Sequence, residues 1–265
     1  MLLTLFQWLC VLGIFAAALA GGLYPLLRPT KARDIHSLPL GEAFTSGVFL
    51  ALALTMMLPS AFHVLGTSLP GVNFPVAALI AVFAFLLLLA IEHASHLVER
   101  GAAQVDGDQM PAVIPLIMTT LIAIPSFLLG AAFAVSATET AIFIFIAIMM
   151  HKSSAAFGLA LMMVRSRLKH WQAWMTFLLF ALATPLGIVF GADLHQNLGN
   201  EAMVLAKGII LALAGGVFLF LSTLHQFQHA AMIRICCTKN GFLFLLAGFA
   251  ITALVRLIIG EAHQL

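Results

Sequence analysis

Long apolar runs separated by short polar connections dominate this chain. A helix needs about 20 apolar residues to cross a hydrocarbon core of roughly 30 Å, and eight runs reach or approach that length. Their expected bounds are 3–27, 40–66, 73–97, 112–135, 141–164, 171–192, 203–230 and 241–260. Continuous apolar runs favour helices over the alternating pattern of membrane barrels. The pattern therefore predicts an all-α membrane protein, with eight transmembrane helices forming a single domain over residues 1–265.

Composition agrees with this prediction. Hydrophobic residues make up 63% of the chain and charged residues 8%, whereas soluble domains carry about 25% charged residues. No polar stretch is long enough to form a soluble domain of its own. The first apolar run lacks a basic start and a small-residue cleavage site, so we expect a retained span rather than a signal peptide.

Lys and Arg fall mainly in alternate connections. The connections after the first, third, fifth and seventh spans hold nine of the twelve basic residues, which are Arg28, Lys31, Arg33, Arg100, Arg165, Arg167, Lys169, Arg234 and Lys239. The even connections contribute Lys207, and Lys152 and Arg256 lie within spans. Because cytoplasmic loops are rich in Lys and Arg, the odd connections, including the loop 98–111, are predicted to be cytoplasmic and both termini extracytoplasmic. Topology thus accounts for the basic residues, and nucleic-acid binding is not implied.

A histidine and a lysine stand side by side near the middle of the fifth predicted span. His151 and Lys152 fall about half-way across the bilayer, where a charged group costs several kcal/mol unless it meets a partner or a polar cavity. The small residues that follow favour close helix packing; they are Ser153, Ser154, Ala155, Ala156 and Gly158. The alternative is a satisfied structural histidine beside a lysine that extends toward an interface.

Other polar residues recur at helical spacing. Glu92 with His96, His225 with His229, and Met56 with Ser60 are each four residues apart and share a helix face, and His63 lies a further turn along. Imidazole and carboxylate pairs of this kind bind zinc. Polar caps at helix ends and methionine packing in a core are the alternatives. Pro59, Pro125 and Pro185 each free a backbone carbonyl inside a span, which either lines a cavity or produces a simple kink.

Four segments resemble the ZIP family of zinc and iron transporters. The fifth span reads HKSSAAFGLA over 151–160, which is similar to a ZIP subgroup whose fifth helix carries H-K-A-P-A-A-F-G-L. The second span reads ALTMMLPSAFH over 53–63, and keeps the proline and histidine of that subgroup. The sixth has ATPLGI over 183–188 and the seventh AGGVFLFLSTLH over 214–225, both similar to family patterns. The resemblance covers nearly the whole chain and implies the ZIP-like bundle of eight helices with both ends outside.

The chain departs from the family pattern at the expected metal ligands. Pro125 stands where the fourth helix of the family carries a histidine, and Leu129 where it carries an acid. Ser60 replaces an acid in the second span, His229 one in the seventh, and Ala155 one that many members have in the fifth. A dehydrated divalent cation needs several anionic or imidazole ligands. The resemblance therefore implies a transport site that has lost most of its carboxylates.

Two hypotheses follow from the resemblance. In the first, a divalent metal cation, zinc above all, crosses toward the cytoplasm with His151 as central ligand and Ser126 and Thr184 as helpers. Met56, Ser60 and His63, together with His225 and His229, would line the cytoplasmic exit. In the second, a degenerate ZIP-like protein binds a regulatory partner, or passes a softer metal through Met and His.

An enzyme is disfavoured, because no nucleophile–base pair or metal-hydrolase motif stands out. Zinc would be cargo, and no cofactor is expected. The expected surroundings are the lipid bilayer of a cell membrane, the inner membrane if the source is a Gram-negative bacterium. A homodimer is left open.

Overall fold

The computed structural model describes residues 3–28, 39–103, 112–136, 138–223 and 239–262. Within these ranges the chain is helical, and eight helices are long and apolar enough to cross a membrane. The helices are α1 (Leu5–Leu27), α3 (Pro39–Leu52), the π-helical turn η1 (Ala53–Met57), α4 (Leu58–Ser68), α5 (Val76–Ala103), α6 (Val113–Val135), α7 (Thr138–Arg165), α8 (His170–Asn197), α9 (Asn200–Thr223) and α11 (Lys239–Ala262). The prediction of eight membrane helices is confirmed, with α3, η1 and α4 together forming the second.

Two helices run further than the hydrophobic pattern indicates. Helix α5 continues to Ala103, so the first part of the segment predicted as a loop over 98–111 is helical, while 104–111 lie outside the described residues. Helix α8 continues to Asn197, five residues beyond its predicted end. Backbone hydrogen bonding within a helix continues wherever the chain allows, whereas the hydrophobic pattern ends where the hydrocarbon is expected to end.

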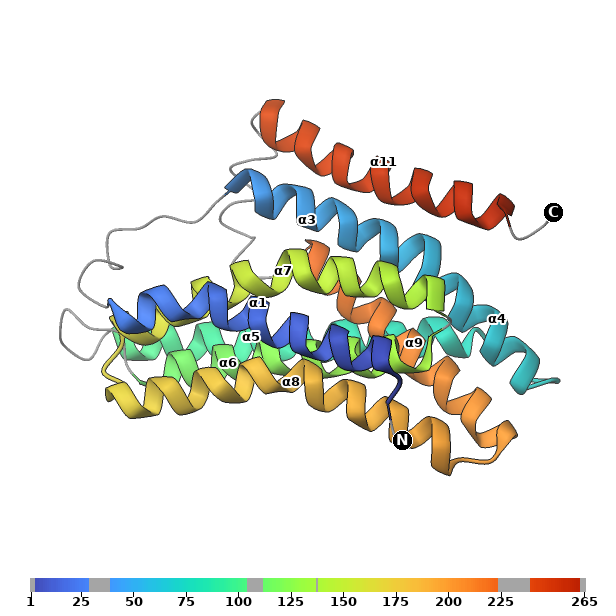
Figure 1. Cartoon of the computed structure of the whole chain (residues 1–265), viewed down its shortest axis with the longest axis horizontal. Coiled ribbons are helices and arrows are strands. Elements are labelled where there is room, and N and C mark those ends of the chain that lie inside the picture. The colour runs from blue at the N-terminus through green and yellow to red at the C-terminus, as the bar shows by residue number, and fades with distance from the viewer. Residues whose placement is uncertain (1–2, 29–38, 104–111, 137, 224–238, 263–265) are drawn as a thin grey trace.

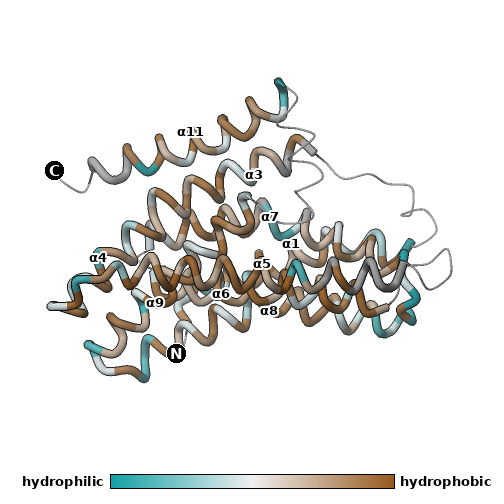
Figure 2. The backbone as a smooth tube through the Cα atoms, turned by 180° about the vertical axis from the view of Figure 1, so that it is seen from behind, coloured by the Kyte–Doolittle hydropathy of each residue, from teal (hydrophilic) through white to brown (hydrophobic). Residues whose placement is uncertain are grey.

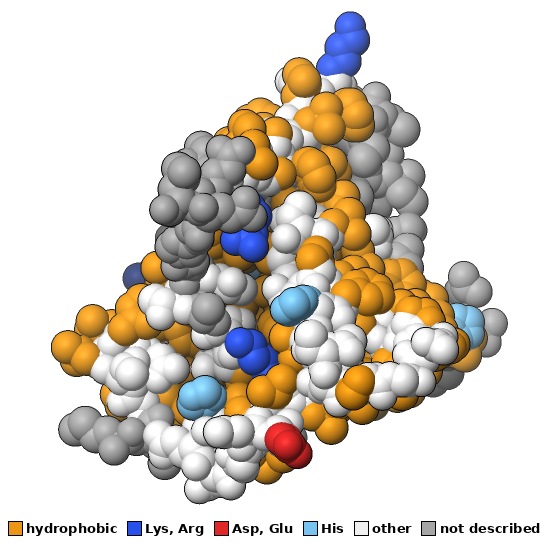
Figure 3. Space-filling model, turned by 90° about the vertical axis from the view of Figure 1, so that its right-hand side faces the viewer, with side chains coloured by type: hydrophobic (Ala, Val, Ile, Leu, Met, Phe, Trp, Pro, Cys, Tyr) orange, Lys and Arg blue, Asp and Glu red, His pale blue; other side chains and the backbone are white. Residues whose placement is uncertain are grey.

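Both termini lie at the same end of the bundle, on the right in Figure 1. The turns from α4 to α5 and from α8 to α9 lie at that end, and the last residues of α1, α5 and α7 lie at the other. Hydrophobic positions follow the middle of the helices and hydrophilic ones gather toward their ends (Figure 2). Figure 3 looks onto the end that carries the termini, where a few basic, histidine and acidic side chains lie among backbone atoms and hydrophobic side chains. Which end faces the cytoplasm stays a prediction.

The helices pack into two groups. Helix α1 packs mainly on α7, and α6 mainly on α8, and α1 also contacts α8. We call α1, α6, α7 and α8 the first bundle. Helix α11 packs on α3, and α9 contacts α5, α4 and α3, so these helices with η1 form the second bundle. The two bundles meet where α6 contacts α9 and α5, and where α3 contacts α7.

Glycines set the closest helix crossings. A Cβ on Gly130 of α6 would overlap the carbonyl oxygen of Thr184 on α8, and a Cβ on Gly187 would overlap that of Phe127. Helices approach this closely in membranes because small residues let backbones touch, and packing replaces the hydrophobic drive that lipid does not supply. The crossing of α6 and α8 is therefore fixed by backbone contact, and it holds Thr184 in place.

Candidate functional site

His151 lies at the interface of the two bundles. It is the fourteenth of the 28 residues of α7, so it stands half-way along the helix as the sequence predicts. Its half-buried ring meets the ring of Phe49 on α3 edge to face, with centroids 4.9 Å apart. Phe49 is fully buried and also contacts Phe218 of α9 at 5.1 Å between centroids. The predicted central ligand thus points from the first bundle toward the second predicted span.

Lys152 points into the first bundle instead. The side chain is 2% exposed, so it does not extend to an interface as the alternative interpretation expected. Its Nζ donates to the carbonyl oxygen of Phe180 and to Oγ1 of Thr184, both at 3.1 Å. It also lies 3.9 Å from the centroid of the Phe180 ring, within the range of a cation–π interaction. Neutral acceptors and an aromatic face therefore solvate the ammonium among the described residues.

Thr184 and Ser126 lie at the crossing of α6 and α8. Thr184 is 1% exposed, and its hydroxyl oxygen accepts the bond from Lys152. Ser126 is 8% exposed, next to Phe127, whose carbonyl oxygen touches Gly187. The structure brings both predicted helper residues into the first bundle, and the hydroxyl oxygen of Thr184 already accepts a hydrogen bond from Lys152.

The helix of the second predicted span changes its winding four residues after Phe49, which contacts His151. In η1 the N–H of Leu58 donates to the carbonyl oxygen of Ala53, five residues back. Pro59 follows and has no N–H to give to the helix. Hence the proline predicted as a kink comes directly after a π-helical turn, a feature that often marks functional sites. Met56 within η1 is 2% exposed, and Ser60 is half-buried on α4.

The predicted exit lies only partly within the described residues. His63 is exposed near the end of α4, at the end of the molecule that carries the termini (Figure 1). His225 and His229 lie outside the described residues, in the segment that follows α9. Helix α9 begins at the end that holds His63 and runs away from it (Figure 1). Whether Met56, Ser60 and His63 share an exit with His225 and His229 stays a prediction.

The donor set around His151 is poor in charge. Within the described residues, no three His, Cys, Asp or Glu side chains come close enough to hold a metal ion. Pro125 and Leu129, which replace the family's histidine and acid, are both buried in α6. Two pockets, of about 400 and 120 Å³, lie beside the end of α1 and beside the turn between α4 and α5, and none of the predicted site residues lines them. Among the described residues, the ring of His151 contacts the ring of Phe49, so a metal site that includes Met56, Ser60 or Ser126 stays a prediction.

Sequence reasoning did not identify Phe49 and Phe180 as parts of the site. Aromatic residues are common in apolar spans, so nothing in the pattern singles out the two that contact His151 and Lys152. The π-helical turn was also unexpected, although Pro59 marked its position. Glu92, expected as a solvated cap, is 5% exposed on α5, and the side chain of His96 lies outside the described residues.

Fold and site together define a multi-pass helical membrane protein with a histidine between two bundles and a buried lysine beside it, half-way along one helix. Such an arrangement is typical of transporters. The chain belongs to the ZIP family, because the family described as "ZIP Zinc transporter" matches residues 4–113 and 108–256.

Relatives from plants and animals are similar over most of the chain. Zinc transporter 3 of Arabidopsis thaliana is 24% identical over 237 residues, which is 79% of this chain and 70% of the relative. Zinc transporter ZIP9 of Xenopus tropicalis is 27% identical over 199 residues, 71% of this chain and 65% of the relative. Zinc transporter ZIP1 of Homo sapiens is 26% identical over 253 residues, 81% of this chain and 76% of the relative. The chain thus spans about two thirds to three quarters of these relatives.

Proposed function

We propose that this protein carries a divalent metal cation, zinc, across a cell membrane toward the cytoplasm. Membership of the ZIP family and relatives named as zinc transporters support the proposal. The observation that carries it is the place of His151, which stands half-way along α7 and faces Phe49 of the other bundle. A neutral imidazole binds borderline cations such as zinc, and a group between two bundles is exposed in turn to either side when the bundles move.

The remaining ligands of the proposed site are neutral. Ser126, Ser60 and Met56 supply hydroxyl and thioether donors from α6, α4 and η1, while Thr184 contributes through its contact with Lys152. His63 stands at the end that carries the termini, so we assign it to the entry side. His225 and His229 lie outside the described residues and remain candidates for the cytoplasmic exit.

Few anionic ligands mean weak binding. A carrier must release its cargo, so a site made of neutral donors favours turnover over affinity. We therefore expect uptake that saturates at higher zinc concentration than in a protein with a carboxylate at this level. The buried Lys152 ammonium adds to this effect, because like charges repel more strongly in a medium of low dielectric constant.

Uptake into liposomes tests the proposal. The purified full chain is reconstituted, and zinc entry is followed with an indicator inside the vesicles. The wild type is compared with His151→Ala and with His170→Ala, which removes an exposed histidine at the start of α8. We expect His151→Ala to lose most of the uptake and His170→Ala to retain it. Equal uptake by all three would remove His151 from the pathway, and no uptake by any would favour the degenerate, non-transporting alternative.

A further inference from the structure

Two adjacent residues of α7 point into different bundles. Consecutive helical residues are rotated by about 100° about the helix axis. Lys152 reaches Phe180 and Thr184 of α8 in the first bundle, whereas His151 meets Phe49 of α3 in the second. Rotation of α7 about its axis would therefore change both sets of contacts together.

Backbone contact fixes how closely α7 approaches α1, but it does not by itself select one rotation of α7. The residues that follow Lys152 on α7 are small, and at the contact with α1 the carbonyl oxygen of Ser153 lies where a Cβ on Gly21 would be. Small side chains form low ridges on a helix surface, so they select one rotation less strongly than large side chains do. A directional contact is needed to select one rotation.

Lys152 supplies that contact. Its ammonium has two hydrogen bonds of 3.1 Å to α8 and is 98% removed from solvent. Turning α7 would strand the charge among apolar groups, which is costly inside a membrane. The acceptors are themselves immobile, because the backbone at Thr184 is pressed against Gly130 of α6.

We propose that Lys152 is a positioning residue, which holds α7 at the rotation that presents His151 to Phe49 between the two bundles. Its importance for transport rests on the proposed function, whereas its effect on the geometry does not. Lys152 contacts neither the cation nor its ligand His151 in this account. It acts through its contacts with Phe180 and Thr184, and its effect is measured as the position of the side chain at residue 151 relative to residue 49.

Cysteine cross-linking measures the rotation without any need for transport. The native cysteines, Cys10, Cys236 and Cys237, are replaced by serine or alanine, and cysteines are placed at positions 49 and 151 of the full chain. A short bis-thiol reagent is applied in membranes. The rate of cross-linking is compared between this parent and the same protein with Lys152→Met, which keeps the length of the side chain and removes its charge and donors.

Three controls separate positioning from simple stability. A second parent carries cysteines at 6 and 133, where Phe6 of α1 and Phe133 of α6 have ring centroids 6.1 Å apart within the first bundle. Thr184→Val removes one acceptor without changing Lys152. If Lys152→Met does not fold, Thr184→Val replaces it in the experiment. Thr184→Ser keeps the hydroxyl and serves as its matched control.

We expect Lys152→Met to slow cross-linking between 49 and 151 by about tenfold or more, as for the loss of hydrogen bonds to a charged group. Thr184→Val should slow it less, Thr184→Ser should match the parent, and the pair at 6 and 133 should be unaffected. Unchanged cross-linking between 49 and 151 in Lys152→Met would overturn the proposal. Equal loss at both pairs would also overturn it, because Lys152 would then support the fold in general.

Zinc uptake by Lys152→Met, with His151 and Phe49 intact, links the geometry to function. A displaced His151 should raise the zinc KM more than it lowers the maximal rate. Dependence of cross-linking on Lys152 in a protein that shows no uptake would leave the positioning role standing and reject the proposed function. Normal cross-linking in Lys152→Met, with wild-type uptake, would do the reverse.

Discussion

At the scale of single residues, this protein places neutral side chains where a metal carrier of its family would carry acids. Ala155 is one turn beyond His151 on the same face of α7 and is 7% exposed. Leu129 of α6, which also stands where the family resemblance implies an acid, is 3% exposed. Burial without charge keeps the interior stable, because an unpaired carboxylate inside a membrane is costly. Without these acids, His151 is the main candidate ligand for a metal ion in this part of the protein.

Restoring one carboxylate should increase the affinity for zinc. Ala155→Glu builds a histidine and a glutamate four residues apart, a spacing that binds zinc. We expect the KM for zinc uptake to fall by about tenfold, one added charged ligand being worth at least 1.4 kcal/mol. Uptake measured over a range of zinc concentrations gives the value. Ala155→Gln is the control for shape, and an equal KM in the two variants would contradict the prediction.

At the scale of helices, the sequence predicts number and order well and local detail poorly. Each apolar run is long enough to specify a membrane helix by itself, so all eight were predicted. The π-helical turn at Ala53–Met57 was not, because its winding depends on how α3 and α4 pack on α9. The contact of Phe49 with His151 joins residues about 100 positions apart, and no periodicity within one helix reports such a pair. The resemblance of the fifth span to a family motif identified His151 as a candidate, but only the fold shows which residues contact it.

Glycine substitutions should separate tight crossings from free helix faces. Gly187→Ala places a methyl group against the carbonyl oxygen of Phe127, and overpacking of this kind costs about 1–3 kcal/mol. Gly66→Ala, on the exposed face of α4, meets no described atom within 4 Å and gains helix propensity of up to about 1 kcal/mol. Thermal unfolding in detergent should therefore show a lower Tm for the first variant, and an unchanged or higher one for the second. A lower Tm for Gly66→Ala alone would contradict this account of the crossings.

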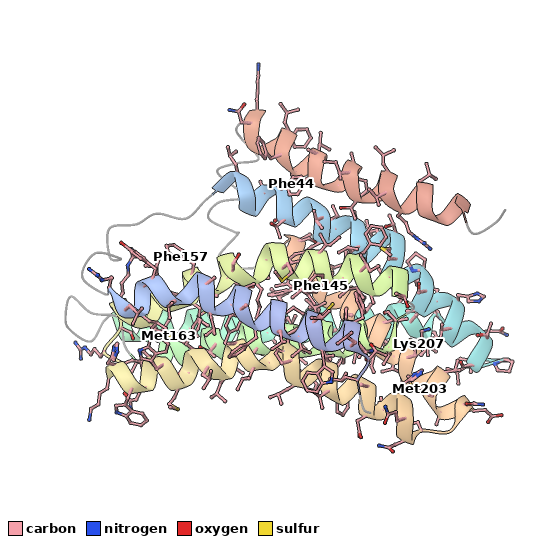
Figure 4. All side chains as sticks on the ribbon, in the orientation of Figure 1. Phe44, Phe145, Phe157, Met163, Met203 and Lys207 are labelled. Atoms are coloured by element: carbon pink, nitrogen blue, oxygen red, sulfur yellow. The ribbon has the colours of Figure 1, made fainter. Side chains whose placement is uncertain are left out.

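At the scale of the whole molecule, the charge distribution and the even number of spans together predict how the protein is oriented in the membrane. Both termini lie at one end of the bundle (Figure 1), as an even number of crossings requires. Met203 and Lys207 of α9 lie toward that end, and Phe157 and Met163 of α7 toward the other (Figure 4). The basic residues that follow α1 and α7 predict that the second end faces the cytoplasm.

Labelling from one side of the membrane tests this orientation. In a protein without its native cysteines, Gly199→Cys lies in the turn between α8 and α9, and His170→Cys lies at the opposite end of α8; both positions are exposed. An impermeant maleimide added to intact cells should label position 199 at once and position 170 only after the membrane is opened. The reverse pattern would invert the predicted topology.

The two bundles suggest how a site at their interface gains access to both sides. Contacts are extensive within each bundle and fewer between them, so relative movement of the bundles disturbs the least packing. Phe6 and Phe133 join α1 to α6 within the first bundle, and Phe85 and Phe220 join α5 to α9 within the second, with ring centroids about 6 Å apart in each pair. If each bundle moves as a body, a covalent link at either pair should leave transport intact.

Cysteine pairs at these positions test rigid-body movement directly. We expect zinc uptake after cross-linking at 6 and 133, or at 85 and 220, to stay close to that of the same protein before cross-linking. Each variant is its own control, because a reducing agent opens the link without changing the sequence. Uptake that stops on cross-linking and returns on reduction would show that helices move within a bundle. In that case access to His151 would have to come from bending inside a bundle, for which the π-helical turn beside Pro59 is the most irregular point in the described helices.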